Sequence, residues 1–178
     1  ADLPGARFIA NSRFTAQRFA EAFGVEARVI YPLLQPERYA VERTGDEVLF
    51  VNPHPHKGLD VALALAERCP DIPFAFVEAW TLEEAERRDL VRRIDRLPNV
   101  TLVPRARDMR AIYRRARLLL APSRWEEAFG RVVVEAQVSG IPALASRRGG
   151  LPEAVDDAGV LVDPDSGIEA WVAALAAA

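Results

Sequence analysis

The amino-acid sequence predicts an α/β fold, with a Rossmann-like, doubly wound parallel sheet in a three-layer α/β/α arrangement. Short apolar runs alternate with longer amphipathic stretches along the chain, which is the pattern of βαβ units around a buried sheet. No internal repeat or low-complexity linker interrupts this alternation. The 178 residues are 50% hydrophobic and 28% charged, a composition typical of one globular domain with its own core. We therefore expect residues 1–178 to form a single domain.

Eight apolar runs rich in Val, Leu, Ile and Phe are expected to be the strands. They are residues 7–10, 28–31, 47–52, 73–78, 99–103, 117–121, 142–146 and 160–162. Right-handed crossovers then give a doubly wound sheet, and ligands of such folds bind at the carboxyl ends of the strands. The loops that follow the strands are therefore the expected location of the functional site.

Seven stretches between these runs are expected to be helices. They are residues 12–23, 59–68, 82–96, 109–116, 131–139, 151–156 and 166–178. In the second helix, Leu59, Ala62 and Leu63 recur at helical spacing and form a face that can cover the sheet. The third helix begins with acidic and ends with basic residues, as the helix dipole favours, and is expected to be a solvated surface helix. Residues 32–46 are expected to be a loop over the sheet edge.

Composition and charge exclude several classes of protein. The net charge of -3 argues against a protein that mainly binds nucleic acid. A single cysteine cannot form a disulfide within the chain, which favours a reducing compartment, and we expect a cytoplasmic location. No apolar run approaches the roughly 20 residues of a membrane span. The chain lacks an initiating Met and ends in an apolar, helix-like stretch, so we expect a fragment of a longer protein, for which peripheral membrane contact stays open.

The first loop of interest follows the strand predicted at residues 47–52 and contains Lys57-Gly58, with the only lysine among 23 Lys and Arg residues. Because a predicted helix follows, the Lys57 ammonium and the first helical amides form a candidate phosphate site. The alternative is a helix start with an exposed lysine, and the pattern of a P-loop is absent. His54 and His56 have no further metal ligands placed near them, so we expect them to stiffen the loop or contact a ligand.

The second loop follows the strand predicted at residues 117–121 and precedes a helix. It carries Glu127, and Glu135 lies inside the following helix. Gly130, between them, lets the backbone approach a ligand closely. Carboxylates accept hydrogen bonds from sugar hydroxyls and free amides donate to phosphoryl oxygens, so the segment suits a phosphorylated sugar. In the alternative interpretation Glu127 only favours the helix start, and Glu135 is buried with a partner, because an unpaired buried carboxylate is costly.

The third loop lies within residues 146–153 and combines Gly149-Gly150 with Arg147 and Arg148. The glycines permit a tight turn that leaves amides open, and the two arginines are candidate phosphate contacts. A plain turn with solvated arginines is an equal alternative for this loop.

Three stretches of sequence carry a resemblance to a known family. They are Pro122-Ser123 with Glu127-Ala-Phe-Gly130 and Glu135-Ala, then Ser139-Gly140-Ile-Pro142-Ala-Leu-Ala-Ser146, then Gly149-Gly150-Leu-Pro-Glu153. In this order and spacing they resemble the carboxyl-terminal, nucleotide-sugar-binding half of the glycosyltransferase family 4 (group 1) enzymes. The resemblance covers nearly the whole chain, and residues 8–19 resemble the segment that crosses into that domain. It implies a GT-B architecture of two facing Rossmann-like domains, of which this chain is one.

The resemblance also implies roles for individual residues. Glu127 corresponds to the catalytic acidic residue near the donor sugar, Lys57 to the residue that grips the donor diphosphate, and Glu135 to the residue that holds the ribose hydroxyls. Further donor-binding positions are Asn52, Gly58, Phe129, Gly130 and Arg131, with the backbone of residues 102–105 near the base. Such enzymes transfer a sugar from a nucleotide diphosphate sugar, such as a UDP- or GDP-sugar, with retention of configuration and without an obligatory metal or other cofactor. The acceptor domain would precede residue 1.

Two departures from the family pattern leave a second function open. Val51-Asn52 stands where the family usually has Gly-Arg, and Ala79-Trp80 lies where a Gly-rich turn is common. One diphosphate-binding cation is therefore absent. The chain is either the donor domain of a transferase or a degenerate domain that binds a nucleotide sugar without transferring it.

Two other enzyme classes explain less of the sequence. A glycoside hydrolase with Glu127 and Glu135 as its paired carboxylates would leave Lys57 without a role. A Rossmann dehydrogenase is disfavoured, because no Gly-x-Gly-x-x-Gly follows any predicted strand.

Overall fold

The computed structural model describes residues 5–178 and confirms the predicted α/β class. Six parallel strands form the main sheet in the order β5-β4-β3-β6-β7-β8. They are β3 Glu47–Val51, β4 Phe74–Val77, β5 Val100–Val103, β6 Ala116–Ala121, β7 Ala143–Ser146 and β8 Gly159–Val162. Each of them lies within two residues of its predicted range. The chain therefore builds the sheet outward from β3 to one edge, then returns to β6 and builds to the other edge.

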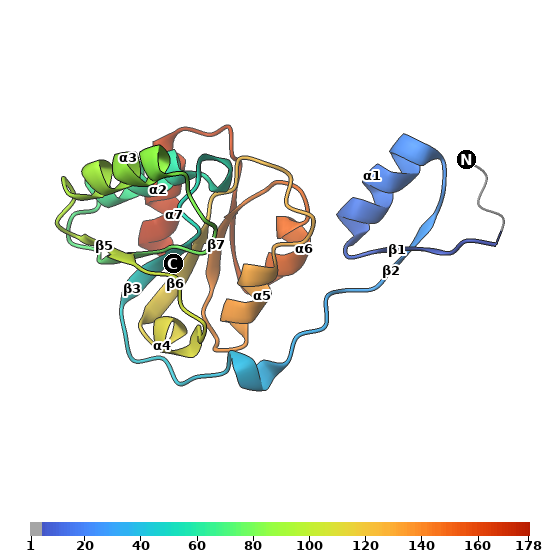
Figure 1. Cartoon of the computed structure of the whole chain (residues 1–178), viewed down its shortest axis with the longest axis horizontal. Helices are drawn as coiled ribbons and strands as arrows, with labels where there is room; N and C mark the ends of the chain where they lie inside the picture. Colours follow the sequence, from blue (N-terminus) through green and yellow to red (C-terminus); the bar gives the residue numbers. More distant parts are fainter. Residues whose placement is uncertain (1–4) are drawn as a thin grey trace.

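Helices cover both faces of this sheet, which gives the three predicted layers (Figure 1). They are α2 Leu59–Arg68, α3 Glu84–Ile94, α4 Arg110–Tyr113, α5 Arg131–Gln137, α6 Leu151–Val155 and α7 Ile168–Ala177. The helices α2, α3 and α7 pack on one face, and α4, α5 and α6 on the other. In β3, Val48 and Phe50 face the first group, and Leu49 faces the second, as expected for a strand with alternating side chains. Within the described part of the chain, no helix has the length and apolar character to cross a membrane.

Two short 3₁₀ helices add to the predicted elements. They are η1 Pro36–Arg38 and η2 Pro55–Lys57. The first lies in the segment expected to be a loop, and the second lies between β3 and α2. Both start at a proline, whose fixed φ suits the first position of a helix.

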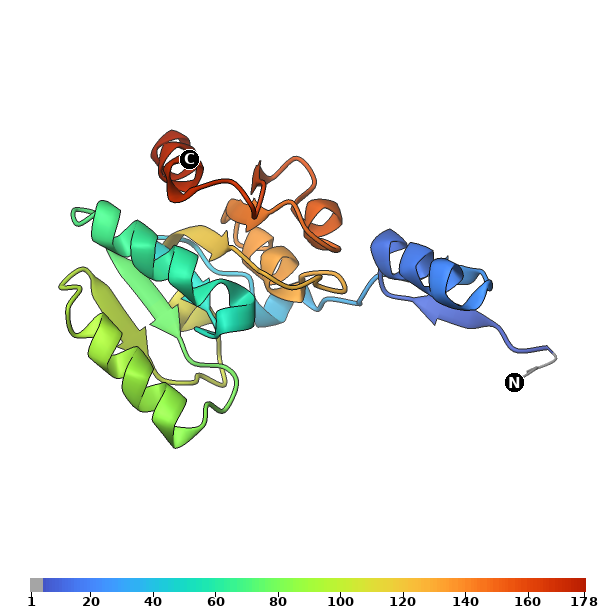
Figure 2. The same ribbon diagram turned by 90° about the horizontal axis from the view of Figure 1, so that it is seen from above.

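The doubly wound sheet includes only six of the eight strands that the sequence predicts. The strands β1 Phe8–Ala10 and β2 Ala27–Val29 pair with each other in a separate parallel sheet, joined by α1 Arg13–Phe23. We call residues 8–31 the β1–α1–β2 unit. Figures 1 and 2 show it to one side of the main body, beyond α6. Apolar runs predict strands but not their partners, and each of these strands has only three residues, so its pattern is too short to specify a place in the main sheet.

Candidate functional site

The strand order places the candidate site between β3 and β6. The chain leaves β3 toward one edge of the sheet and leaves β6 toward the other, so their carboxyl ends flank a crevice. Ligands of doubly wound sheets bind in this crevice. Lys57 follows β3 and Glu127 follows β6, and the fold therefore brings the first two predicted loops together.

Lys57 and Glu127 contact each other directly in this crevice. The Lys57 Nζ donates to Glu127 Oε1, and the two side chains are only 17% and 15% exposed. Ser123 Oγ donates to the same oxygen at 2.6 Å, and Ser123 is 2% exposed. Two donors thus fix the orientation of the Glu127 carboxylate, and Ser123 is a site residue to which sequence reasoning assigned no role. It stands in the Pro122-Ser123 pair that precedes Glu127 in the sequence.

A small cavity of about 160 Å³ lies beside this pair. Its polar lining comes from the loops after β3 and β6, and its apolar lining from β3, β6, α5, α6 and the loop after β4. The residues around it are Phe50, Val51, Asn52, Lys57, Ala79, Trp80, Leu120, Ala121, Ser123, Glu127, Val132 and Leu151. A larger hollow of about 440 Å³ lies between α2, α3 and the start of β5, at the opposite edge of the sheet. The smaller cavity is the one that contains the predicted chemistry.

Two tryptophans that the sequence did not single out as ligand contacts surround the Lys57 ammonium. Its Nζ lies 5.0 Å from the ring centroid of Trp80 and 5.4 Å from that of Trp125, within the range of a cation–π interaction. The His56 ring stacks on Trp125 at 5.5 Å, and His54 Nδ1 accepts from the His56 amide at 3.2 Å. The predicted loop-stiffening role of the histidines is thus supported by their contacts.

Asn52, which stands where the family usually has an arginine, takes a structural position in this loop. It is 5% exposed, its φ is +69°, and its Oδ1 accepts from the Trp80 amide at 3.0 Å. The side chain therefore ties the end of β3 to the loop after β4. A direct role for Asn52 in donor binding stays a prediction.

Glycines allow the loops to approach one another. Gly58, with φ +82°, precedes α2, and a Cβ there would lie 2.0 Å from the Pro122 carbonyl oxygen. Gly130, with φ +96°, precedes α5, and a Cβ there would lie 2.7 Å from Leu151 Cδ2. Both positions need the left-handed backbone and the missing side chain of glycine. At Gly130 the close neighbour is Leu151 of α6, and the predicted close approach of its backbone to a ligand stays a prediction.

Glu135 lies inside α5, as predicted, and it has the partners that its burial requires. Its Oε1 lies 2.8 Å from Arg131 Nε, and its Oε2 accepts from Tyr113 Oη at 3.3 Å. Burial raises the pKa of Tyr113, and the Glu135 charge raises it further, so the phenol stays a donor. Arg131 Nη2 also donates to Tyr39 Oη at 3.0 Å. Glu135 and Glu127 thus belong to two separate networks, and Glu135 does not line the cavity beside Glu127 among the residues described.

The family model described as glycosyl transferases group 1 matches residues 46–178. The chain belongs to this family. A curated relative, the D-inositol 3-phosphate glycosyltransferase of Mycobacteroides abscessus, is 32% identical over 178 residues, which cover 97% of this chain and 35% of the relative. The enzyme of the same name from Corynebacterium kroppenstedtii is 44% identical over 94 residues, or 51% of this chain and 20% of the relative.

Solved structures of glycosyltransferases share the GT-B domain fold of this chain. A glycosyltransferase from Rickettsia africae superposes with a TM-score of 0.87 at 18% identity and covers 98% of this chain and 53% of its own. The Anabaena protein Alr3699/HepE, in complex with UDP-glucose, gives 0.84 at 24% identity, with 96% and 53% covered. The chain spans about a third or less of these curated relatives and about half of these solved structures.

The remaining predicted site residues of this member of the group 1 family do not line the cavity beside Lys57 and Glu127. Phe129 is 8% exposed, with its ring 5.5 Å from that of Tyr31. Arg148 donates to Asp165 Oδ2 at 3.4 Å, and the Arg147 side chain is exposed. Their roles toward a donor phosphate, and that of residues 102–105 at the end of β5, stay predictions. Within residues 5–178 no group of three or more His, Cys, Asp or Glu is placed to hold a metal ion.

Proposed function

We propose that this chain is the donor-binding domain of a retaining hexosyltransferase, which takes a sugar from a nucleotide diphosphate sugar. The observation that carries the proposal is the Lys57–Glu127 pair at the crevice between β3 and β6. A cation and a carboxylate at one small cavity suit a ligand that carries both phosphate and hydroxyl groups. The solved Alr3699/HepE complex with UDP-glucose supports a uridine diphosphate sugar as the first donor to test.

The proposed chemistry follows from where charge develops during transfer. As the bond between sugar and diphosphate breaks, negative charge grows on the leaving diphosphate, and a fixed ammonium stabilises this charge more than the ground state. In the structure the Lys57 ammonium is balanced by Glu127 and two indole rings. A bound diphosphate would compete for Lys57 and release the Glu127 carboxylate to accept hydrogen bonds from the sugar. Because Lys57 can supply the cation at the diphosphate, we propose no obligatory metal or other cofactor.

The acceptor is proposed to bind to a second domain of the same enzyme. The chain spans about half of the solved glycosyltransferase structures that it resembles, and the reaction centre would lie between the two halves. The 178 residues alone should bind donor but transfer little sugar. We further propose that the enzyme works in the cytoplasm, with peripheral contact to a membrane if its acceptor is a lipid.

A binding module without transferase activity is the second candidate function. Asn52 offers no cation to a diphosphate, and its side-chain oxygen is already bound to the Trp80 amide. Donor affinity would then rest on Lys57 without a second arginine. A glycoside hydrolase is less favoured, because Glu127 and Glu135 have separate partners and do not line one cavity in the described chain.

Calorimetric titration of the chain with UDP-glucose and GDP-glucose tests donor binding. We expect micromolar to millimolar affinity, and a loss of at least roughly tenfold in Lys57→Ala, because hydrogen bonds to charged groups contribute more than about 1.4 kcal/mol. Lys57→Arg should also weaken binding, since a planar guanidinium cannot replace a compact ammonium between two indoles. Arg96→Ala, which removes one exposed cation at the opposite edge of the sheet, is the control and should bind as the wild type does.

The two candidate functions differ in what the longer enzyme does with a bound donor. Incubation of the longer enzyme with UDP-glucose and candidate acceptors, followed by NMR of the anomeric proton, reports transfer and its stereochemistry. Transfer with retention supports the leading proposal. Donor binding without transfer to any acceptor or to water supports the binding module, and an absence of nucleotide binding by the wild-type chain contradicts both.

A further inference from the structure

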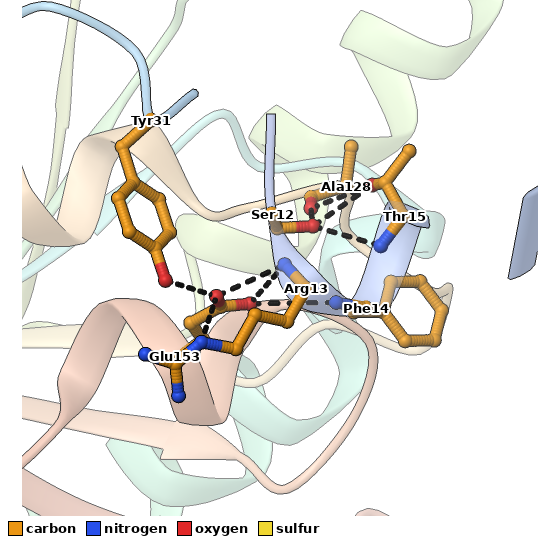
Figure 3. A network of polar contacts seen from close by, with 7 residues as sticks. All are labelled: Ser12, Arg13, Phe14, Thr15, Tyr31, Ala128 and Glu153. Carbon is orange, nitrogen blue, oxygen red and sulfur yellow. Dashed lines mark hydrogen bonds and ion pairs between the residues drawn. The ribbon is translucent and has the colours of Figure 1, made fainter. Parts of the chain in front are cut away.

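A set of polar contacts joins the β1–α1–β2 unit to the main body of the molecule (Figure 3). We call these residues the clasp: Ser12, Thr15, Tyr31, Ala128 and Glu153. In the described chain, the hydrogen bonds, ion pairs and ring contacts between residues 8–31 and the main body all reach residues 126–129 or Glu153. These contacts of the unit therefore converge on one part of the main body, which includes the candidate site loop.

One half of the clasp is a carboxylate at the start of a helix. Both oxygens of Glu153 accept from the Arg13 amide at 2.9 Å, and Oε2 also accepts from the Phe14 amide at 3.4 Å. Tyr31 Oη donates to the same carboxylate, and the Glu153 side chain is 15% exposed. The first amides of a helix have no partner within it and carry partial positive charge, so a largely buried carboxylate there is a favourable contact.

The other half of the clasp is a backbone carbonyl in the site loop. The Ala128 oxygen accepts from Ser12 Oγ and, at 3.1 Å, from Thr15 Oγ1. Ser12 is fully buried, and its Oγ also accepts from the Thr15 amide at 2.9 Å as the N-cap of α1. The same side chain thus begins the helix and fixes the peptide next to Glu127.

The residues on either side of Ala128 are held as well. The Gly150 amide donates to the Glu127 carbonyl at 2.7 Å, and a Cβ on Gly150 would lie 2.5 Å from the Ala128 oxygen. Phe129 packs its ring on Tyr31 at 5.5 Å. The loop backbone is therefore enclosed between the Gly149-Gly150 turn and the first turn of α1.

We propose that the clasp is a positioning device for the site, with Glu153 as its central positioning residue. Glu153 does not contact Lys57 or Glu127 in the described contacts; it acts by docking α1, whose Ser12 and Thr15 then hold the peptide after Glu127. Docking of the β1–α1–β2 unit and donor binding are consequently coupled, and the donor part of this coupling rests on the proposed function. By linkage the coupling is reciprocal: a donor that requires the ordered loop must also strengthen the docking of α1.

Hydrogen exchange without any ligand tests the positioning role. Glu153→Gln removes the charge at the α1 start, and Glu47→Gln is a matched control, because Glu47 is 16% exposed and paired with Arg115 at the beginning of β3. We expect amides of residues 127–131 to exchange at least about fivefold faster in Glu153→Gln, the lower end of typical coupling, and at the wild-type rate in Glu47→Gln. Equal exchange of these amides in both variants would overturn the proposal.

A second variant distinguishes loss of the clasp from general misfolding of Glu153→Gln. Ser12→Ala removes a donor to Ala128 and the N-cap of α1 without altering Glu153. Like Glu153→Gln, it should accelerate exchange in two segments, residues 12–16 and 127–131. Amides of the buried strand β4, remote from the clasp, should keep their protection in each variant. Acceleration in only one of the two segments means that the unit and the loop are not coupled.

Titration with UDP-glucose tests the link to the donor. We expect the dissociation constant to rise at least about fivefold in Glu153→Gln and to stay unchanged in Glu47→Gln. UDP-glucose should also slow exchange of the Arg13 and Phe14 amides in the wild type, a response that a purely structural residue would not give. If all variants bind UDP-glucose equally, the coupling is overturned. If the wild type binds no nucleotide sugar, the proposed function is wrong. The positioning role of Glu153 is then decided by the hydrogen-exchange experiment without ligand.

Discussion

The main sheet and the small β1–α1–β2 sheet contain similar apolar residues but bury them very differently. All four residues of β4 and of β7 are buried, whereas α1 has no buried residue. In the small unit Ile9 is 67% and Phe23 69% exposed. Burial therefore comes from the neighbours that an element finds and not from its own composition. The main body has a core on each face of its sheet, and the small unit depends on a polar clasp.

The family match divides the molecule at the same place. It begins at residue 46, one residue before β3, and it leaves out the whole β1–α1–β2 unit. The residues proposed to bind the donor all lie in the matched part, while the clasp connects that part to the unmatched one. The comparison of the two regions can be tested by equivalent substitutions in each.

The largest expected loss of stability comes from a large-to-small substitution in the core of the main sheet. Phe76 is fully buried, with ring contacts to Phe50 and Phe74, so Phe76→Ala should lower the free energy of unfolding by about 3–5 kcal/mol. Ile9→Ala, at a site that is 67% exposed, should lower it by less than about 0.5 kcal/mol. Urea denaturation followed by far-UV circular dichroism measures both. A loss of several kcal/mol in Ile9→Ala would mean that the small unit has a core of its own.

A second pair of substitutions compares two glycines with the same backbone conformation. Gly58 has φ +82° and Gly24 has φ +67°, and alanine in the left-handed region costs about 1–2 kcal/mol at either. At Gly24 nothing lies within 4 Å of the added Cβ, but at Gly58 it meets the Pro122 carbonyl at 2.0 Å. We expect Gly24→Ala to cost only the conformational term, and Gly58→Ala to cost about 1–3 kcal/mol more because the backbone must shift.

The two variants should also differ in where the loss appears. Gly24→Ala should accelerate hydrogen exchange in α1 and leave the main sheet protected, since the contacts between the two regions in the described chain reach only residues 126–129 and Glu153. Gly58→Ala should lower the midpoint of global unfolding. Equal losses of global stability in the two variants would contradict the division of the chain into a self-supporting body and a docked unit.

Much of the main body could be predicted from the sequence, because its strands are continuous apolar runs. The range predicted at residues 47–52 became β3 at Glu47–Val51, and the Lys57 loop lies at its carboxyl end. The separate pairing of β1 and β2 could not be predicted. A short apolar run identifies a strand, but which strand lies beside it depends on contacts that are distant in the sequence.

The candidate site was also predictable only in part. Lys57 and Glu127 meet because parallel strands end at one edge, which is a rule of topology and needs no side-chain detail. The rings around Lys57 were missed, since Trp80 and Trp125 are 45 residues apart and neither forms a motif by itself. Glu153 ends the motif Gly149-Gly150-Leu-Pro-Glu153, but its role could not be predicted, because its partners Arg13 and Phe14 lie about 140 residues away in the sequence.

The smallest expected effect concerns an ion pair that, unlike the clasp, joins residues close in sequence. Side-chain and backbone hydrogen bonds from Arg110 lower the pKa of Asp108 to about 2. A carboxyl group whose pKa is lower in the folded state contributes stability above its unfolded pKa, near 3.9, and loses this contribution as the pH falls through about 2. In urea denaturation, the difference between the wild type and Asp108→Asn should therefore be constant above pH 5 and shrink toward pH 2.

This local pair also provides the reference for the clasp. In an Arg110→Ala background, which keeps the amide of residue 110 as a donor to Asp108, the pH-dependent difference caused by Asp108→Asn should become smaller, and an undiminished difference would mean that the Arg110 side chain does not lower the pKa. Because Asp108 and Arg110 are two residues apart, their loss should change hydrogen exchange only around α4. Glu153→Gln, which breaks contacts between two regions, should change it in two segments more than 100 residues apart. The location of the segments whose hydrogen exchange changes, more than the size of the change, therefore distinguishes a contact within one region from a contact that couples two regions.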